Sequence, residues 1–178
     1  MSATQKEKSV LLKSLLNVLL NIDGSTTLAL ETMTKSKLNL HMISHTMLSE
    51  EQLPSRMKEV FTGKGPFMMR RTGLMIDKEM ISENIVYYDL SLFSNEFLDD
   101  LNNGEFPIGK LIKSTEYRRD ILFSGWITPD QIKSHGFERR KKSPLKIYKI
   151  VKNNLCWFYI YELFNTDIIY QKVNQFCN

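Results

Sequence analysis

The sequence is poor in the residues on which disulfide scaffolds and metal centres depend. Of its 178 residues only two are cysteines and three are histidines. Cys156 and Cys177 form no CxxC pair, so we do not expect a disulfide framework. This cysteine usage predicts a reducing compartment. His41 and His45 have a spacing that suits a metal on a helix, but their segment alternates like a strand and would hold them about 13 Å apart. We therefore expect no metal site.

Long hydrophobic runs and glycine-rich nucleotide motifs are also missing. The apolar segment near the N-terminus is interrupted by Lys13 and Asn17, so it predicts neither a signal peptide nor a membrane span. Gly63-Lys64-Gly65 lacks the spacing of a phosphate loop and is typical of a turn between strands. No serine lies in a GxSxG motif, and no Cys–His signature is present. These absences argue against nucleotide binding and nucleophilic hydrolysis.

What is present is the composition of one globular domain. Hydrophobic residues make up 42% of the chain and charged residues 25%, which allows a sizeable core over residues 1–178. We expect residues 1–8 to be flexible and residues 166–178 to form a C-terminal tail. The net charge of +4 permits contact with nucleic acid, but it suits an enzyme with an anionic substrate equally well. Because most aromatic residues alternate into predicted strands, we expect no nucleic-acid partner.

The hydrophobic periodicity predicts an α+β fold. Helical spacing or capping residues mark segments near 10–22, 25–34, 94–101 and 107–113, and Thr128-Pro129-Asp130 opens a helical turn. Alternation predicts strands at 38–48, 57–62, 67–76, 116–127, 145–152 and 155–164, with 82–92 as a connection. Asn153-Asn154 suits the tight turn of the last hairpin. Strands joined by short turns imply an antiparallel sheet with helices packed on it.

Glu162 is the most informative residue, because it is a carboxylate inside the apolar segment 155–164. Alternation places it on the same strand face as Phe158, Ile160 and Phe164. Burial of that kind disfavours the charged form and raises a carboxyl pKa toward the range useful for proton transfer. Glu162 is therefore a candidate acid or base. The alternative is a structural glutamate paired with a nearby arginine or lysine.

Arg70 and Arg71 point to opposite faces of their predicted strand, so at most one can enter the core side. Such an arginine could pair with Glu162 or bind a carboxylate of a ligand. The basic run at 139–142 is typical of a solvated loop.

Four stretches in this order resemble the chorismate pyruvate-lyase family, which makes 4-hydroxybenzoate and pyruvate from chorismate. They are Asp23-Gly24-Ser25-Thr26-Thr27, the segment 58–72, Pro107-Ile108-Gly109-Lys110-Leu111, and Arg139-Arg140 followed by Tyr161-Glu162-Leu163-Phe164. The likeness is strongest toward the short cyanobacterial, archaeal and plastid-encoded members. The bacterial enzyme of ubiquinone biosynthesis is a more distant relative.

The resemblance implies a chorismate lyase-like fold, a six-stranded antiparallel sheet with helices over enclosed ligand sites. It implies that Glu162 is catalytic and that Arg71 binds the ring carboxylate. The backbone amide of Ile108, followed by Gly109, would meet the same carboxylate, and Thr26 would line the pocket. No cofactor is implied, and the partners would be chorismate and 4-hydroxybenzoate. The location would be the cytoplasm, or the plastid stroma for an organelle-encoded chain.

Two departures from the family pattern concern the shape of the pocket. Thr26 replaces a larger apolar residue, and Asn165-Thr166 replaces a proline that follows the glutamate. A second function class therefore stays open, since the same fold serves as the effector-sensing domain of some bacterial repressors. Such domains are joined to a DNA-binding helix-turn-helix, for which there is no room before Leu11. The sequence leaves the oligomeric state open.

Overall fold

The computed structural model describes residues 3–103, 107–112 and 116–175. One antiparallel sheet of six strands, in the order β1-β2-β3-β6-β5-β4, forms its centre. The strands are β1 (Asn39–Leu48), β2 (Phe67–Ile76), β3 (Glu79–Asp89), β4 (Arg118–Ile127), β5 (Ser143–Lys152) and β6 (Leu155–Phe164). The α+β class and the six-stranded antiparallel sheet predicted above are thus confirmed.

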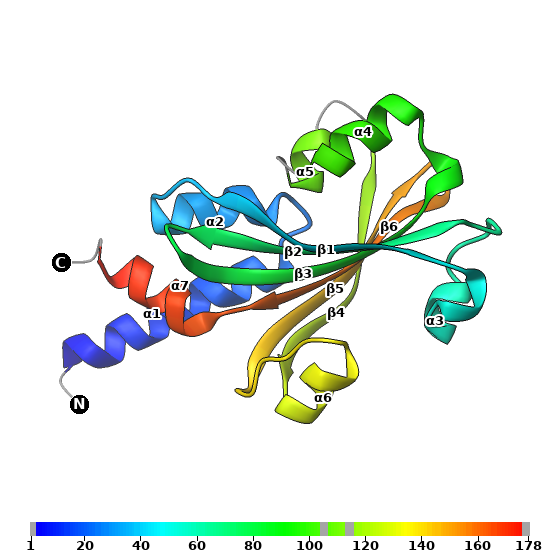
Figure 1. Ribbon diagram of the computed structural model, residues 1–178. Coiled ribbons are helices and arrows are strands. Elements are labelled where there is room, and N and C mark those ends of the chain that lie inside the picture. Colours follow the sequence, from blue (N-terminus) through cyan, green and yellow to red (C-terminus); the bar gives the residue numbers. More distant parts are fainter. Residues whose placement is uncertain (1–2, 104–106, 113–115, 176–178) are drawn as a thin grey trace.

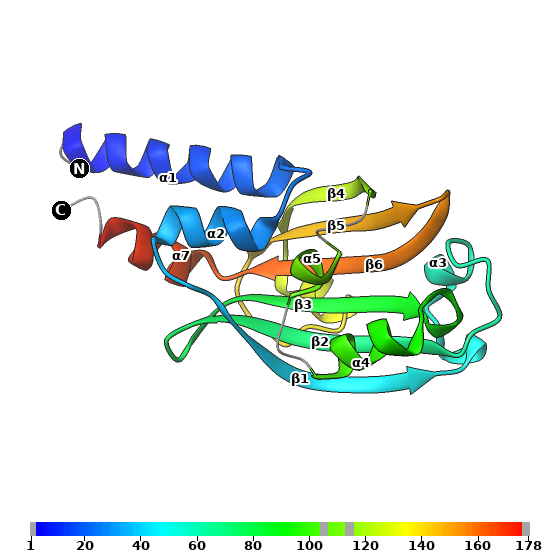
Figure 2. The same cartoon turned by 90° about the horizontal axis from the view of Figure 1, so that it is seen from above.

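Helices cover both faces of this sheet (Figures 1 and 2). The described residues form α1 (Ala3–Asn21), α2 (Thr26–Thr34), α3 (Ser55–Lys58), α4 (Asn95–Asn103), α5 (Ile108–Leu111), α6 (Pro129–Ser134) and α7 (Thr166–Asn174). Short 3-10 turns span Glu50–Gln52 and Leu90–Leu92. In Figure 2, α2, α4 and α5 lie in front of the sheet, whereas Figure 1 shows α3 and α6 on the opposite side. The face under α2 and α5 holds the candidate site.

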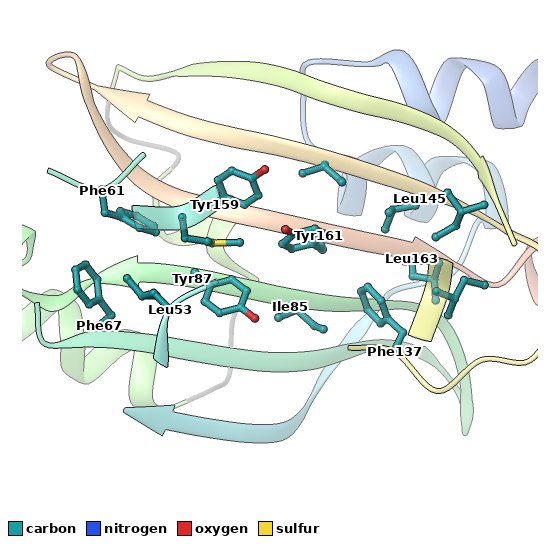
Figure 3. Close-up of a cluster of buried hydrophobic side chains, with 14 residues drawn as sticks. Leu53, Phe61, Phe67, Ile85, Tyr87, Phe137, Leu145, Tyr159, Tyr161 and Leu163 are labelled. Carbon is teal, nitrogen blue, oxygen red and sulfur yellow. The ribbon is translucent and has the colours of Figure 1, made fainter. Parts of the chain in front are cut away.

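The hydrophobic core divides into three clusters. One lies on the face of α3 and α6 and includes Leu53, Phe137 and Tyr161 (Figure 3). The other two lie on the opposite face: the first packs α1, α2 and α7 against one end of the sheet around Phe164, and the second packs α4 and α5 around Phe158. Because side chains of a strand alternate between faces, each central strand contributes side chains to the clusters on both faces of the sheet.

One predicted strand was wrong and one was missed, although the total of six was right. Residues 57–62 do not form a strand, because α3 begins at Ser55 and a loop follows it. The partner of β2 is instead β3, in the segment where the sequence predicts a connection. The polar triplet Ser82-Glu83-Asn84 interrupts the apolar pattern of β3. Asn84 lines the cavity described below, and Glu83 forms an ion pair with Arg71.

Several local expectations are confirmed. Ser25 caps α2 by accepting a hydrogen bond from the Leu28 N–H, and Asn153 and Asn154 both have positive φ in the last turn. Helices occupy both terminal segments. Residues 3–8 belong to α1, and the C-terminal tail contains α7, which buries Ile169 and Val173. Residues 1–2, Gly104, Lys113 and Cys177 lie outside the described residues.

Candidate functional site

A row of polar side chains crosses the sheet between the two apolar clusters on the α2 and α5 face. Cα pairing aligns Thr72 with Asn84, Asn84 with Glu162, and Glu162 with Lys146, so the row spans β2, β3, β6 and β5. All four side chains are buried. Burying polar groups costs free energy unless partners or a ligand compensate. The row therefore marks the part of this face that needs a functional explanation.

A cavity lies over this row, closed by the start of α2 and by α5. Its lining side chains come from α2, α5 and all six strands, and the polar ones are Ser25, Thr26, Thr27, Arg70, Thr72, Asn84, Arg119, Tyr148 and Glu162. The cavity has a volume of about 50 Å³. An apolar cavity of about 150 Å³ holds one benzene ring. A ring-sized ligand therefore requires the lining to move outward.

Glu162 is 4% exposed, and Thr26 is its hydrogen-bond partner. Its second carboxylate oxygen, Oε2, is buried and has no hydrogen-bond partner among the described residues. Burial raises the pKa of Glu162, while the positive charge of Lys146, the Thr26 hydrogen bond and the charge of Arg119 act to lower it. The result is a carboxyl group with a raised pKa and one free oxygen beside a cavity, which is the setting of a proton-transfer group.

Two cations join this part of the sheet to the end of α1. Lys146, which is 1% exposed, donates hydrogen bonds from Nζ to the Ile22 carbonyl and, at 3.5 Å, to the Leu19 carbonyl. Arg119 donates from Nη1 to the Gly24 carbonyl and, at 3.1 Å, to the Asp23 carbonyl. Carbonyls at a helix C-terminus lack helical partners and attract cations. These contacts hold the α1–α2 turn, and with it Thr26, over Glu162.

The structure corrects the choice between the two neighbouring arginines. Arg70 lines the cavity and is 1% exposed. Arg71 points to the other face, where its Nε lies 2.5 Å from Glu83 Oε1 and its side chain is 22% exposed. Arg71 therefore does not share a cavity with Glu162, contrary to the position that the family resemblance implied. Burial lowers the pKa of Arg70, and the neighbouring Tyr88 opposes that shift.

The remaining predicted residues do come together. Thr26, Ile108 and Gly109 all line the cavity with Glu162. Ile108 is the first residue of α5, so its N–H is one of the groups that have no partner within the helix. A Cβ on Gly109 would lie 3.4 Å from Arg119 Nη2, which shows how closely α5 approaches that guanidinium.

The sequence reasoning did not single out Asn84, Lys146, Tyr148 or Arg119. Asn84 lay in the segment taken as a connection. Lys146 and Tyr148 occupy alternate positions of a correctly predicted strand, and that alternation was the only available signal. For Arg119 the signal was the same, because it precedes the apolar run of β4 on the face opposite Arg118.

No group of three metal-ligating side chains occurs within residues 3–103, 107–112 and 116–175. His45 instead makes a 2.7 Å hydrogen bond with the Tyr88 hydroxyl. In the same part of the chain, no helix combines the length and the apolar character that a membrane crossing requires.

The fold and the site together define an α+β protein with a small polar cavity on the α2 and α5 face of its sheet. The family model for Rv2949c-like chorismate pyruvate-lyases matches residues 20–171. The chain therefore belongs to the Rv2949c-like chorismate pyruvate-lyase family, as the sequence motifs had indicated. No protein with a curated description matches it by sequence.

Solved structures with a similar fold are domains of bacterial regulators. PhnF from Mycobacterium smegmatis superposes with a TM-score of 0.58 at 13% identity, covering 83% of this chain and 66% of PhnF. The effector domain of PhnF alone gives a TM-score of 0.58 at 13% identity, with 81% and 90% covered. The C-terminal domain of the histidine utilization repressor from Pseudomonas syringae pv. tomato gives 0.51 at 7% identity, with 72% and 91% covered. At these identities the likeness concerns the fold alone.

Proposed function

We propose that this protein is a chorismate pyruvate-lyase that releases pyruvate from chorismate and leaves 4-hydroxybenzoate. The observation that carries the proposal is the pairing, in one buried cavity, of a carboxyl group with raised pKa and an arginine on a separate strand. Glu162 and Arg70 supply, respectively, a proton-transfer group and a cation matched to a carboxylate. Family membership of residues 20–171 supports the same reaction.

Arg70 takes the role that the resemblance assigned to its neighbour. Its guanidinium, together with the Ile108 N–H at the start of α5, would bind the ring carboxylate of chorismate. Glu162 lies on β6, two strands away from Arg70, so it would meet the other end of the ring, where the C4 hydroxyl and the ether oxygen are. Thr26 would hold the Glu162 carboxyl in position through its hydrogen bond.

The reaction breaks the C3–O ether bond and removes the hydrogen at C4, which makes the ring aromatic. Aromatisation supplies much of the driving force, so the protein needs to orient the substrate and handle one proton. Oε2 of Glu162, the oxygen without a hydrogen-bond partner, is the atom available to assist removal of the C4 hydrogen or to protonate the departing oxygen. The same oxygen would accept a hydrogen bond from the phenol O–H of the product.

The direct test is incubation of the purified protein with chorismate while 4-hydroxybenzoate and pyruvate are both measured. Equal amounts of the two products, formed in proportion to enzyme concentration, are expected. Formation of neither, by a folded protein, would contradict the proposal.

A second function is favoured by the structural neighbours, one of which is the effector domain of a regulator. On that alternative the cavity binds an aromatic acid without converting it. Binding of 4-hydroxybenzoate together with intact chorismate after long incubation would identify this case.

A further inference from the structure

The face of the sheet opposite the candidate site carries a second, larger hollow, which we call the α3–α6 cleft. Its walls come from α3, α6 and β4, and α3 and α6 stand apart on this face (Figure 1). Its floor is part of the cluster in Figure 3, through Ile127, Ile147 and Tyr159. The cleft has a volume of about 540 Å³, against about 50 Å³ for the cavity under α2 and α5. A volume of that size is typical of a small-molecule site.

An irregularity in β4 turns two neighbouring apolar side chains toward this cleft. Cα pairing passes from Ile121 and Tyr148 directly to Phe123 and Ile147, so Leu122 is an extra, bulged residue. Ile121 packs on the α4 and α5 face, whereas Leu122 and Phe123 both line the cleft. In an unbroken strand Leu122 and Phe123 would point to opposite faces. The bulge therefore gives the cleft a continuous apolar wall.

The two side chains of this wall remain partly open to solvent. Leu122 is 47% exposed and Phe123 is 39% exposed. A Cβ on Gly125 would lie 3.3 Å from Phe123 Cζ, so the Phe123 ring lies against the backbone of Gly125. An apolar ligand body resting on Leu122 and Phe123 would remove their surface from water, which is favourable.

The charged side chains of the cleft favour an anion. Arg56 of α3, Lys149 of β5 and Glu59 belong to the lining. Lys149 shares Asp120 with Arg118, because Asp120 Oδ2 lies 3.8 Å from Lys149 Nζ and Asp120 Oδ1 lies 2.6 Å from Arg118 Nε. These five residues are three cations and two carboxylates, so one positive charge is in excess. A ligand with one negative charge would balance it.

The charge of Arg56 is directed across the cleft. Burial lowers the pKa of His135, which follows α6, and the charge of Arg56 lowers that pKa further. Burial and the neighbouring Tyr159 raise the pKa of Tyr161, and the charge of Arg56 opposes that rise. A guanidinium that acts on both His135 and Tyr161 points toward α6 and the floor of the cleft. Arg56 is therefore placed to meet the anionic group of a ligand.

We propose that the α3–α6 cleft is a second ligand site, which takes an amphipathic anion with an apolar body larger than one ring. The apolar body would rest on Leu122 and Phe123, and the anionic group would bind Arg56. Among the described residues, the cleft and the cavity under α2 and α5 have no lining residue in common. The inference is therefore independent of the proposed lyase reaction.

The test uses 8-anilinonaphthalene-1-sulfonate, whose fluorescence rises in apolar surroundings, and N-phenyl-1-naphthylamine, which has the same rings without the sulfonate. Fluorescence titration gives the affinity and the stoichiometry for the wild type and for Phe123→Ala. Trp126→Ala is the matched control, because Trp126 is on the same strand, is 45% exposed and does not line the cleft. Leu122→Gln repeats the test at the more exposed residue of the wall, where lost packing disturbs the fold least.

We expect the wild type to bind one molecule of the sulfonate probe per chain. Phe123→Ala and Leu122→Gln should each weaken that binding roughly tenfold, because a large apolar contact is lost, and Trp126→Ala should change it less than about twofold. Equal losses in Phe123→Ala and Trp126→Ala would overturn the inference. Displacement of the probe by 4-hydroxybenzoate would place the probe under α2 and α5, and would overturn it as well.

The requirement for an anion is tested at Arg56. Arg56→Gln should weaken binding of the sulfonate probe roughly tenfold and change binding of the neutral probe less than about twofold. Lys58→Gln is the control, because Lys58 ends the same helix, is exposed and does not line the cleft. Unchanged affinity of Arg56→Gln for the sulfonate probe would contradict an anion site and overturn the inference.

Two further measurements on the same samples complete the test. Thermal unfolding shows that each titration is made on folded protein, since the sulfonate probe also binds partly folded chains. Light scattering gives the oligomeric state. A dimeric wild type that binds neither probe would mean that a second copy of the chain covers the cleft, and a monomer that binds neither would mean that the cleft is not a ligand site. Either result would overturn the inference.

Discussion

Two rows of residues cross the middle of the sheet one position apart, and they differ in almost every respect. The first row lies under α2 and α5 and consists of Thr72, Asn84, Glu162 and Lys146. The second row lies on the opposite face and consists of Arg71, Ile85, Tyr161 and Ile147. In the first row every residue is polar and buried, whereas the second is apolar except for the arginine at its end.

The two faces of this sheet therefore differ in content: one carries apolar packing, and the other carries polar groups beside the cavity. The three apolar residues of the second row belong to the cluster of Figure 3, where Tyr161 meets Tyr87 edge to face at 6.3 Å. Packing of this kind stabilises the fold without charged groups. In the first row Lys146 and Thr26 compensate Glu162, and one carboxylate oxygen remains available. Substitutions at the same strand positions should therefore have different effects on the two faces.

The largest difference is expected at Glu162 and its neighbour Tyr161. Glu162→Gln keeps the size of the side chain but removes the ionisable group, so pyruvate release should fall by about 100-fold or more, the scale of a lost general acid or base. Tyr161→Phe removes a hydroxyl from the other face and should leave turnover near that of the wild type. Initial rates with chorismate measure both. Normal turnover by a folded Glu162→Gln protein would remove Glu162 from the catalytic role.

The neighbouring arginines provide the next comparison. Arg70→Met should weaken 4-hydroxybenzoate binding about tenfold or more, the scale of a lost charge-assisted pair. Arg71→Met removes the same charge from the opposite face and should change the affinity less than twofold. Calorimetric titration of each variant gives the two values. If Arg71→Met proved the more damaging, the assignment of faces to β2 would be reversed.

The phenol end of the product should make a smaller contribution. Benzoate has no hydroxyl to pair with the free oxygen of Glu162, so it should bind more weakly than 4-hydroxybenzoate by about 1–3 kcal/mol. In Glu162→Gln the difference between the two ligands should shrink. Equal affinities for the wild type would leave Glu162 only its structural role as the partner of Lys146.

The smallest effect concerns the pH dependence of turnover. The charge of Lys146 stabilises the ionised form of Glu162 and so lowers the pKa of that carboxyl group, against the upward shift that burial causes. Lys146→Met should therefore raise the pKa of Glu162 and move the acidic limb of the rate profile to higher pH.

Lys149→Met is the control for this experiment, because Lys149 is on the same strand but pairs with Asp120 away from the cavity. Its acidic limb should coincide with that of the wild type. An unmoved limb in Lys146→Met would show that Glu162 does not titrate in the rate-determining step.

Much of this molecule could be predicted locally. Glu162 was recognised as a buried carboxylate because alternation within one strand gives the face of each side chain. The cap at Ser25 and the turn at Asn153-Asn154 depend on only a few adjacent residues. The prediction of β3 failed because its polar residues interrupt the apolar pattern. The partners of Glu83 and Asn84 come from other strands, so the local sequence does not show them.

The sequence by itself determined the fold class, the family and the burial of Glu162, since these follow from composition, motif order and alternation. Only the tertiary structure decided which side chains surround Glu162. Counting back from the Asn153-Asn154 turn pairs Glu162 with Leu145, but the register shift at Ile150 and Val151 brings Lys146 opposite instead. The face of Arg70 likewise depends on pairing with β3, a strand hidden in the sequence. The register of a strand is set by its pairing with the other strands of the sheet, and a shift of one residue exchanges an apolar row for a polar one.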